Sequence, residues 1–443
     1  MNNFTFYKDE KGREEFELAF MQHFMLYNGE LNNQIAGEKK GFANVGSAYR
    51  IRAAIDPSRL EKCIQRVYDE NPMTRILAVD KGDGRYMQKI ITNYTFKLDV
   101  IEAQGSTEQE KFDYGVEYAT KVMQSYLDPF TGISNKIFLI KLADDDFFFT
   151  IVTHHWIGDG ASLGASLGAI FGSIFKYYID LNAPAVPAGS FIEYIDEERE
   201  FKNSDARKKQ LAYWADEFAG YEKIDLENKI SVLGNDHSNI DRKYTVDIRK
   251  VEEISAANKT SNFQVILMAY HIALSMITGV GDISIGATSA CRTAKYMATV
   301  GFFAHSAFHR LKVSDSDKLT ELLKNSVKIH SKAMSAIRTS FDYYENLQFN
   351  IAYQNYIPAS STKKQAFELE DIPISSVREV NVFYLCPFER KDDLLIMMIG
   401  SGKLFPREFR DMMDQWIKST IAVMSSDPEA TIADIRKYHA ENF

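Results

Sequence analysis

The sequence predicts an α/β protein in which mixed β-sheets are flanked by helices and the chain forms two lobes. Helix and strand signals alternate along all 443 residues. A proline-rich segment, residues 182–190, divides the chain into two regions of similar size. A run of strand-forming residues in the first region leads directly into two adjacent histidines. We therefore expect an N-terminal lobe over residues 1–182, which carries these histidines, and a C-terminal lobe over residues 190–443.

The elements of the first region are indicated by capping residues and by apolar patterns. Asp56 can cap a helix that has Pro57 at its first position, and Pro72 marks its end. Three successive phenylalanines at 147–149 predict a strand buried on both faces, because polar residues do not alternate with them. The expected elements are a helix from 57 to before 72, a hairpin of strands 75–79 and 85–91, a helix from the capping box at 106–109 to about 127, adjacent strands 136–142 and 147–153, and a helix over 161–180.

The second region repeats the alternation of helices and strands. Its closing helix places Phe409, Met413, Trp416 and Ile417 on one face, as expected for a helix that covers a core. The expected helices span residues 191–218, 262–278, 318–338 and 406–425, and the expected strands span 282–287, 302–311, 348–353, 380–385 and 393–399.

Composition excludes several classes of protein. Hydrophobic residues make up 45% of the chain, with 30 Phe and only 10 Pro, which excludes a disordered protein. The net charge of -9 and the absence of a long basic block argue against nucleic acid as a partner. Cys63, Cys291 and Cys386 lack the spacing of a disulfide framework or a zinc site, so we expect no metal. The longest apolar run, near residues 266–280, is too short for a membrane span, and no secretory signal is visible. We expect a soluble, cytoplasmic monomer.

The histidines belong to a His-His-x-x-x-Asp-Gly pattern formed by His154, His155, Asp159 and Gly160. An imidazole titrates near neutral pH, and a nearby carboxylate can organise its surroundings. Acyl transfer to an amine or alcohol needs such a base held beside the nucleophile. The structural alternative is that the histidines only end a buried strand and that Asp159 and Gly160 form a turn.

This pattern resembles the active-site motif of the condensation domains of nonribosomal peptide synthetases. Their relatives with the chloramphenicol-acetyltransferase fold, the thioester-dependent acyltransferases, share the motif. The resemblance extends over nearly the whole chain and departs from the family pattern at Asn71, His305 and Phe308. Six further segments are similar to family segments and follow the family's order: residues 67–75, 126–130, 211–214, 285–292, 300–306 and 353–355.

The resemblance implies two chloramphenicol-acetyltransferase-like lobes arranged in a V, with an active-site tunnel along their interface. The donor thioester would enter from one side and the acceptor from the other, with His155 midway. A crossover segment of the second lobe, within about residues 356–375, would extend back over the first. Possible tunnel-lining residues are Trp156, His305 and Asn355. For His305, a structural role in a strand is the favoured alternative.

The resemblance also implies roles for the motif residues. His155 would act as a general base or would orient the nucleophile and stabilise the tetrahedral intermediate. Asp159 would form a structural ion pair with Arg292 instead of contacting the histidine. Gly160 would allow a backbone conformation that a β-carbon would obstruct, and His154 would support the loop through a hydrogen bond. The acidic run at 144–146 resembles a cation site but is more typical of a solvated turn.

The leading hypothesis is a free-standing condensation-type acyltransferase. It would move an acyl or aminoacyl group from a carrier-protein or coenzyme A thioester to a small amine or alcohol. The thioester supplies the energy, so we expect no bound cofactor; the donor carries phosphopantetheine or coenzyme A. Because the chain shows no phosphopantetheine-bearing serine segment, we expect a carrier protein to dock in trans. The alternatives are an acyl-CoA-dependent O-acyltransferase of a lipid or polyketide alcohol and a catalytically silent module that docks carrier proteins.

Overall fold

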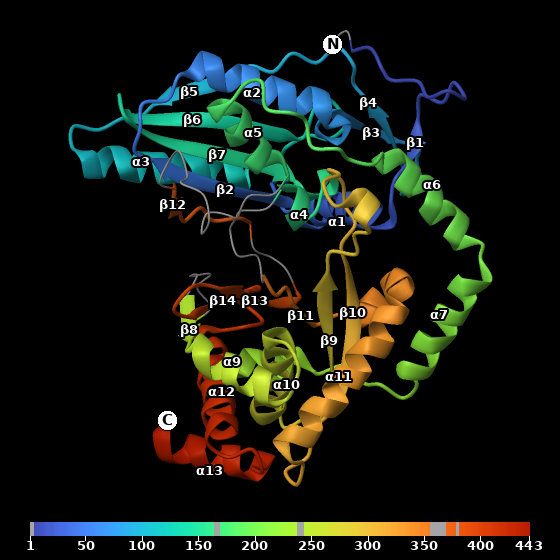
Figure 1. Cartoon of the computed structure of the whole chain (residues 1–443), viewed down its shortest axis with the longest axis vertical. Helices are drawn as coiled ribbons and strands as arrows, with labels where there is room; N and C mark the ends of the chain where they lie inside the picture. The colour runs from blue at the N-terminus through green and yellow to red at the C-terminus, as the bar shows by residue number, and fades with distance from the viewer. Residues whose placement is uncertain (1–3, 164–168, 237–242, 355–368, 378–380) are drawn as a thin grey trace. The chain divides into compact units, whose positions relative to one another are not determined.

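A computed structural model describes residues 4–163, 169–236, 243–354, 369–377 and 381–443 (Figure 1). The chain divides into two compact units. Unit 1 contains Met1–Lys202, Ala290–Ala304 and Pro358–Val377. Unit 2 contains Asn203–Ser289, His305–Ile357 and Arg378–Phe443. The division falls after Lys202 and not within the proline-rich segment at 182–190. Two segments from the C-terminal half of the chain belong to unit 1.

The main sheet of unit 1 has five strands in the order β12-β2-β7-β6-β5. Its strands are β2 (Asn44–Ile51), β5 (Asp99–Glu102), β6 (Asn135–Ala143), β7 (Asp146–His154) and β12 (Leu369–Ile372). The central strand β7 pairs antiparallel with β2 and with β6, and Phe149 lies opposite Tyr49 on one side and Leu139 on the other. Strand β12 lies within the range where we expected the crossover segment, and it pairs with β2. Residues 356–368 of that range lie outside the described residues.

A second, three-stranded sheet of unit 1 has the order β1-β4-β3. Its strands are β1 (Phe16–Glu17), β3 (Ile76–Asp80) and β4 (Tyr86–Ile90). The expected hairpin is therefore confirmed: β3 and β4 are antiparallel, and the turn between them has positive φ at Gly82, Asp83 and Gly84.

Helices cover both faces of the five-stranded sheet (Figure 1). One face packs on α3, through residues such as Ala119 and Met123. The other packs on α2 and α5, through residues such as Cys63 and Ile174. Strand β7 is buried along nearly its whole length because both faces are covered. The helices of unit 1 are α1 (Phe20–Ala36), α2 (Pro57–Glu70), α3 (Glu108–Gln124), α4 (Gly160–Leu163), α5 (Ala169–Ile179) and α6 (Phe191–Lys202), with 3₁₀ turns η1 (Pro72–Arg75), η2 (His155–Ile157) and η4 (Ala294–Tyr296).

In unit 1 the Asp56 cap acts as expected, and the capping box of α3 lies one residue later than expected, at Thr107 and Glu110 instead of Ser106 and Gln109. The Asp56 carboxylate accepts the backbone N–H groups of Ser58 and Arg59 at 2.9 and 3.1 Å, which starts α2. The Thr107 hydroxyl accepts the N–H of Glu110 at 3.2 Å, which starts α3. Each bond satisfies a donor that the first helical turn leaves without an intrahelical partner.

Unit 2 contains a six-stranded mixed sheet in the order β10-β9-β11-β13-β14-β8. Its strands are β8 (Lys243–Val246), β9 (Asp282–Ser289), β10 (His305–Lys312), β11 (Phe349–Ile351), β13 (Phe383–Glu389) and β14 (Leu394–Ile399). Strand β11 is parallel to both of its neighbours, β9 and β13, whereas β9 and β10 are antiparallel. This mixed sheet, flanked by helices, confirms the expected fold class.

Helices flank the sheet of unit 2, and most of them share one hydrophobic core with it. They are α7 (Asp205–Glu217), α8 (Leu226–Lys229), α9 (Ile248–Ala257), α10 (Asn262–Thr278), α11 (Leu319–Ser335), α12 (Arg407–Ser426) and α13 (Ile432–Asn442), with 3₁₀ turns η3 (Ser231–Leu233) and η5 (Ile337–Asn346). Helix α10 is buried from Gln264 to Ser275, which explains its nearly continuous apolar sequence. Among the described residues, no single helix is both long and apolar enough to span a membrane. In the same part of the chain, only α9 and α10 taken together have the length and apolar composition of a span, and the two helices are bent by 104° relative to each other.

Several expected elements have different boundaries in the structure; the strand expected over 380–385, for example, is β13 (Phe383–Glu389). The single helix expected over 191–218 is wrong: α6 ends at Lys202, and the Ser204 hydroxyl caps α7 by accepting the N–H of Arg207 at 3.1 Å. The strand expected from 302 begins only at His305. The reason is tertiary, because the backbone N–H groups of Phe303 and Ala304 donate to the Asp159 carboxylate, at 3.0 and 3.2 Å, instead of to a neighbouring strand.

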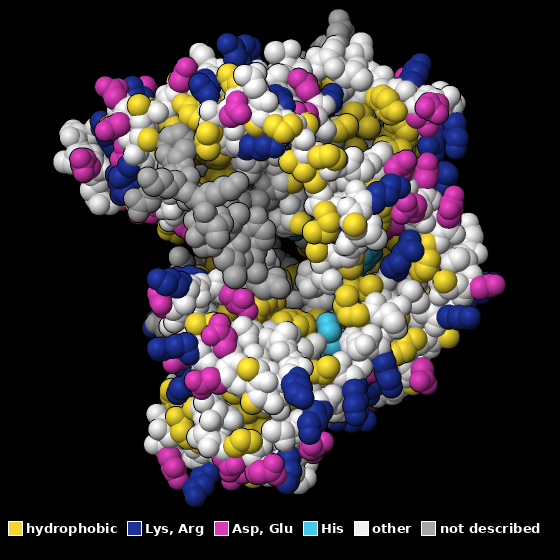
Figure 2. Space-filling model, in the orientation of Figure 1, with side chains coloured by type: hydrophobic (Ala, Val, Ile, Leu, Met, Phe, Trp, Pro, Cys, Tyr) yellow, Lys and Arg dark blue, Asp and Glu magenta, His cyan; other side chains and the backbone are white. Residues whose placement is uncertain are grey.

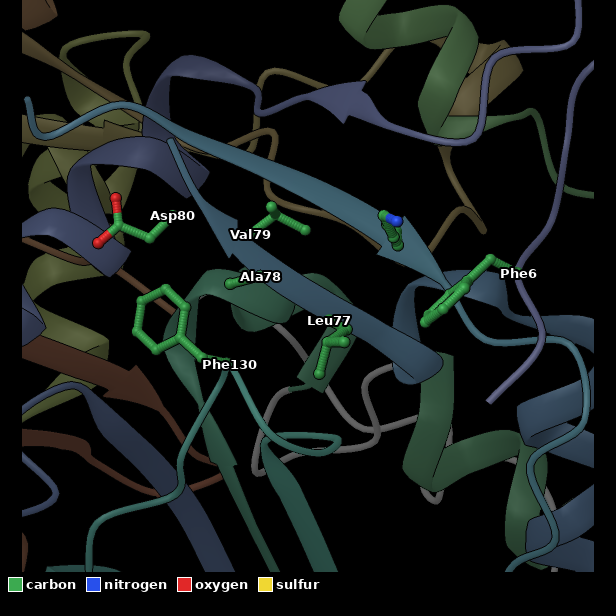
Figure 3. A pocket seen from close by; sticks show the side chains of 7 residues that line it. Phe6, Leu77, Ala78, Val79, Asp80 and Phe130 are labelled. Carbon is green, nitrogen blue, oxygen red and sulfur yellow. The ribbon is translucent and has the colours of Figure 1, made fainter. Parts of the chain in front are cut away.

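A surface hollow of about 430 Å³ lies on the three-stranded sheet of unit 1 (Figure 3). Phe6 and Phe130 stand at opposite ends of it, with Leu77 between them. None of the residues that line this hollow belongs to the histidine motif.

Lysine, arginine and carboxylate side chains are interspersed over the molecular face shown in Figure 2.

Candidate active site

The histidine motif lies at the end of β7, where two backbone bonds fix its direction. The N–H of His154 donates to the carbonyl of Ser134 at 2.8 Å, and the N–H of His155 donates to the carbonyl of Ala43 at 2.8 Å. The chain then turns through η2. Because neighbouring segments hold both histidines by the backbone, their side chains are presented in a fixed geometry.

The His155 imidazole is partly exposed and is held by one polar and one aromatic contact. Its Nδ1 lies 2.9 Å from the carbonyl oxygen of Gly158, and the Phe302 ring lies 5.0 Å away, centroid to centroid. A carbonyl oxygen can only accept, so Nδ1 carries a proton. Burial lowers the pKa of His155, although the Gly158 carbonyl and the charge of Asp159 oppose this shift. A neutral ring with its proton on Nδ1 leaves Nε2 as a proton acceptor.

His154, the last residue of β7, is buried. Its Nδ1 accepts the backbone N–H of Trp156 at 3.2 Å. Burial, with a smaller contribution from His155, lowers the pKa of His154 to about 3. Helix α1 approaches so closely that a β-carbon on Gly29 would lie 3.1 Å from His154 Nε2. These contacts give His154 a supporting position in the packed interior.

The structure brings Asp159 and Arg292 together. Arg292 Nη2 lies 2.7 Å from Asp159 Oδ1, and the side chains are only 3% and 2% exposed. The other carboxylate oxygen, Oδ2, accepts the N–H groups of Phe303 and Ala304. Both oxygens are thus occupied by partners other than His155, so the Asp159 carboxylate does not orient the imidazole by a hydrogen bond.

Arg292 holds the segment that follows it in the chain. Its Nη1 donates to the carbonyls of Tyr296 and Thr299 at 2.9 and 2.5 Å, and its guanidinium lies 4.3 Å from the centre of the Phe303 ring. The preceding residue, Cys291, has a φ of 51°, a left-handed conformation uncommon for a residue with a side chain. The guanidinium therefore connects the histidine motif to the whole loop 290–304.

Two residues of this network, Ser162 and Gly301, were not singled out from the sequence as site residues. Ser162 is fully buried, and its hydroxyl lies 2.8 Å from Arg292 Nη2 and 3.1 Å from Asp159 Oδ1. The same hydroxyl contacts both the carbonyl and the N–H of Gly301, at 2.8 and 3.0 Å. The only sequence signal for Ser162 is its place two residues after the Asp-Gly pair, which by itself is also consistent with an ordinary helical serine.

The structure corrects the expectation for Gly160. We expected that a β-carbon there would be obstructed, but Gly160 is exposed and its backbone is outside the left-handed region. Among the described residues, nothing lies within 4 Å of where its β-carbon would be. As far as the described residues define the site, Gly160 therefore leaves open space beside the motif.

The structure also corrects the expectation for Trp156 as a tunnel-lining residue. Its side chain is 0% exposed and packs in the core of unit 1. The indole N–H donates to the Ser134 hydroxyl at 2.6 Å. A fully buried ring whose polar atom is satisfied serves to hold the strand end in place.

The remaining candidates lie elsewhere or outside the described residues. His305 is buried at the start of β10 in unit 2, where it pairs with Ser289 of β9. Asn355 lies outside the described residues. The acidic run forms a turn in which Asp144 pairs with Lys141 at 2.8 Å and Asp146 is bound by an arginine. Among the described residues, no group of three or more His, Cys, Asp or Glu side chains could hold a metal ion.

The geometry of the motif agrees with the result of comparing the chain with known families. The condensation domain family model matches residues 13–441. The chain belongs to the condensation domain family, which confirms the resemblance inferred from the motifs. Domains of this family use no cofactor of their own and act on phosphopantetheine thioesters of carrier proteins.

Curated relatives are large synthases. A linear gramicidin synthase chain from Brevibacillus parabrevis is 24% identical over 75% of this chain. Tyrocidine synthase 3 from the same organism is 22% identical over 88% of this chain, and bacitracin synthase 2 from Bacillus licheniformis is 25% identical over 92%. The chain spans only 7%, 6% and 16% of the length of these three relatives.

Solved structures share the fold at low sequence identity. The first condensation domain of the calcium-dependent antibiotic synthetase, in complex with substrate analogue 3a, has a TM-score of 0.76 at 14% identity, with 95% of this chain and 98% of that chain covered. The X-domain from teicoplanin biosynthesis has a TM-score of 0.78 at 15% identity, with 96% and 98% covered. The starter condensation domain of rhizomide synthetase has a TM-score of 0.76 at 15% identity, with 95% and 98% covered.

Proposed function

We propose that the chain transfers an acyl or aminoacyl group from a thioester to an amine or alcohol, with His155 as the group that receives the nucleophile's proton. Membership of the condensation domain family supports amide or ester formation between carrier-bound substrates as the reaction class. The observation that carries the proposal for this chain is the bond between His155 Nδ1 and the Gly158 carbonyl. It keeps Nε2 of the neutral ring available as a base.

The proposed reaction needs a single imidazole and no acyl-enzyme. The lone pair of the acceptor nitrogen or oxygen attacks the thioester carbonyl, and its proton passes to His155 Nε2. The tetrahedral intermediate then expels the sulfur, which takes up the proton from the imidazolium as the thiol. The amide or ester and a free thiol are the products. General base catalysis of this kind contributes about 10²–10⁴-fold to the rate.

A second role for His155 is orientation of the nucleophile and stabilisation of the tetrahedral intermediate. The lowered pKa of His155 favours a neutral ring at neutral pH but also makes the ring a weaker base. We therefore assign proton acceptance to His155 in the leading proposal and keep orientation as the competing mechanism. The shared consequence is that removal of the ring slows the chemical step.

The proposed donor is a thioester of phosphopantetheine on a carrier protein, which docks in trans. A solved neighbour, the starter condensation domain of rhizomide synthetase, was crystallised as a double mutant with C8-CoA and Leu-SNAC. Coenzyme A ends in the same phosphopantetheine thiol, so the competing enzyme proposal is an acyl-CoA-dependent O-acyltransferase of a lipid or polyketide alcohol. The tunnel expected from the resemblance stays a prediction.

The alternative from another class is a silent module that only docks other proteins. The X-domain from teicoplanin biosynthesis, which shares the fold, forms a complex with OxyB. In the present chain, His155 keeps the Nδ1 bond that prepares it as a base, and Asp159 keeps its buried partner Arg292. A docking module has no need of a prepared imidazole, so these contacts favour the enzyme.

The test of the proposal is His155→Ala, assayed with acyl and aminoacyl thioesters against amine and alcohol acceptors. We expect the rate to fall by about 10²-fold or more, because the base is lost. The matched control is His23→Ala, since His23 is a partly buried histidine of unit 1 whose Nε2 contacts the Gly84 carbonyl at 2.9 Å. Equal transfer rates for His155→Ala and the parent would remove the histidine mechanism, and no transfer by the parent with any thioester would favour the docking module.

A further inference from the structure

We infer that Ser162 is a positioning residue for His155, acting through the two groups that contact the imidazole. This inference rests on the proposed function, because it concerns the state of the ring that receives the proton. Three observations carry it: the complete use of the Ser162 hydroxyl, its packing against Gly158, and its hydrogen bonds to the residue before Phe302.

The Ser162 hydroxyl uses its full hydrogen-bonding capacity. A serine oxygen has one hydrogen to donate and can accept two. It accepts from Arg292 Nη2 at 2.8 Å and from the N–H of Gly301 at 3.0 Å. Its own hydrogen goes to the Gly301 carbonyl at 2.8 Å, which is closer than Asp159 Oδ1 at 3.1 Å. Gly301 is thus held at both its donor and its acceptor by one side chain.

The first route to the imidazole is through Gly158. A β-carbon placed on Gly158 would lie 2.8 Å from the Ser162 β-carbon and 3.1 Å from its hydroxyl oxygen. Ser162 therefore packs directly on the residue whose carbonyl accepts the Nδ1 proton of His155. Loss of the hydroxyl removes part of this contact and leaves a space beside Gly158, so the carbonyl can turn away and the ring loses the bond that selects its tautomer.

The second route is through Gly301 and Phe302. The Phe302 ring lies 5.0 Å from His155, centroid to centroid, and is 3% exposed. It follows Gly301, whose position Ser162 fixes. On its other side Gly301 packs tightly on Phe191, because a β-carbon on Gly301 would overlap that ring. Ser162 thus holds both the polar and the aromatic neighbour of the imidazole.

Ser162→Ala tests this role with a readout that does not depend on activity. In protein labelled with ¹⁵N in its histidines, and with the His155 signals assigned by their absence in His155→Ala, we expect the parent ring at pH 7.5 to show a protonated Nδ1 and an unprotonated Nε2. In Ser162→Ala we expect a population with the proton on Nε2. Because that tautomer cannot receive the proton, kcat should fall by about 10-fold to 100-fold while KM changes by less than about threefold.

The matched control is Thr74→Val in the same unit. Thr74 is 1% exposed, and its hydroxyl donates to the Asn71 carbonyl at 2.7 Å, so the variant also removes one buried hydroxyl bond. We expect it to leave the His155 tautomer and kcat unchanged. A parent-like tautomer in Ser162→Ala, whatever its stability, would overturn the inference.

Two further measurements keep the test decisive. If Ser162→Ala does not fold, Ser162→Cys retains a weak donor and acceptor, and it should show the same tautomer change to a smaller extent. Unchanged ring signals in the cysteine variant would also overturn the role of Ser162. If instead His155→Ala keeps full activity while Ser162→Ala alters the tautomer, the positioning role stands and the proposed mechanism fails.

Discussion

At the scale of single residues, the motif owes its shape to a guanidinium far from it in the chain. Arg292 and Asp159 are 133 positions apart, yet they form a buried ion pair at 2.7 Å. Arg292 also donates to the carbonyls of Tyr296 and Thr299. Loss of one member of such a pair leaves the other as a buried charge without its partner, which is more costly than loss of a surface pair.

Arg292→Ala should destabilise the protein by about 3–5 kcal/mol and should also lower transfer activity. The control is Arg50→Ala, whose pair with Asp146 has both side chains 16% exposed. For the control we expect a smaller loss of stability and no change in transfer activity. Thermal and urea unfolding check the stability difference. A melting temperature of Arg292→Ala equal to that of the parent would contradict a structural role for the buried pair.

Substitution of Gly160 is expected to have the opposite effect on stability from substitution of Arg292. Its β-carbon would meet nothing within 4 Å among the described residues, and its φ is outside the left-handed region. Gly160→Ala should therefore not destabilise the protein and should stabilise it by up to about 1 kcal/mol, because alanine restricts the unfolded chain. A loss of more than about 1 kcal/mol in urea unfolding would show that the glycine is required for folding.

A larger side chain at the same position tests whether the open space is used. We expect Gly160→Leu to retain the parent melting temperature within a few degrees but to raise KM for the thioester or the acceptor, because the side chain enters space beside the motif. Steady-state kinetics with each substrate varied in turn shows whether the KM for the thioester or the KM for the acceptor is raised. Parent-like KM values for both substrates would show that neither passes Gly160.

At the scale of elements, unit 2 contains a buried histidine cluster on three adjacent elements. His271 on α10 and His309 on β10 share a hydrogen bond of 2.7 Å, and His309 Nε2 donates to the carbonyl of Ser326 on α11 at 3.0 Å. His330, also on α11, lies next to His309 with ring centroids 6.3 Å apart. The cluster connects the helices α10 and α11 to the edge strand of the sheet.

The cluster predicts that stability falls in mild acid. Burial lowers the pKa of His309 and that of His330 to about 4, and it lowers the pKa of His271 well below its usual value. These rings stay neutral in the fold but take up a proton near pH 6.5 once unfolded, so their contribution is complete above about pH 6.5 and is lost between about pH 6.5 and 4. For His309 alone, the shift corresponds to about 3 kcal/mol.

Urea unfolding at several pH values between 4.5 and 7.5 measures this loss. His309→Gln is the informative variant, because glutamine keeps a donor for Ser326 and an acceptor for His271 but does not titrate. We expect the free energy of unfolding of this variant to depend less steeply on pH than that of the parent. If the free energy of unfolding depends equally steeply on pH in the variant and in the parent, His309 does not contribute to the acid sensitivity.

At the scale of the whole molecule, the family supports amide or ester formation as the reaction class, and the donor is a proposal. Carrier proteins and coenzyme A present the same phosphopantetheine thiol, so the chemistry proposed for His155 does not separate them. We expect kcat/KM to be higher for an acyl group on a carrier protein than for the same acyl group on coenzyme A, because the carrier adds a protein contact. Equal or higher kcat/KM for acyl-CoA would favour the O-acyltransferase.

Local signals determined much of the fold. Asp56 with Pro57, the capping signal at 106–109 and the three phenylalanines of β7 predict α2, α3 and a doubly covered strand, since each signal acts within a few residues; the cap of α3 lies one residue later, at Thr107. The break between α6 and α7 also has a local signal, the N-cap Ser204. It was not predicted because the charged residues on both sides of it are equally consistent with one continuous helix. Helices α1, α9 and α13 and strands β2 and β8 are among the elements that were not predicted.

By itself the sequence determined the fold class, the family and the position of the histidines, because these depend on local patterns and on the order of short motifs. The tertiary structure decided which atoms the motif contacts. It directed the Asp159 carboxylate to Arg292 and the loop 301–304, placed Ser162 against Gly158 and Gly301, and buried Trp156 in the core. These contacts join residues up to 145 positions apart, and no local pattern specifies a partner at that distance because close packing between distant segments selects it.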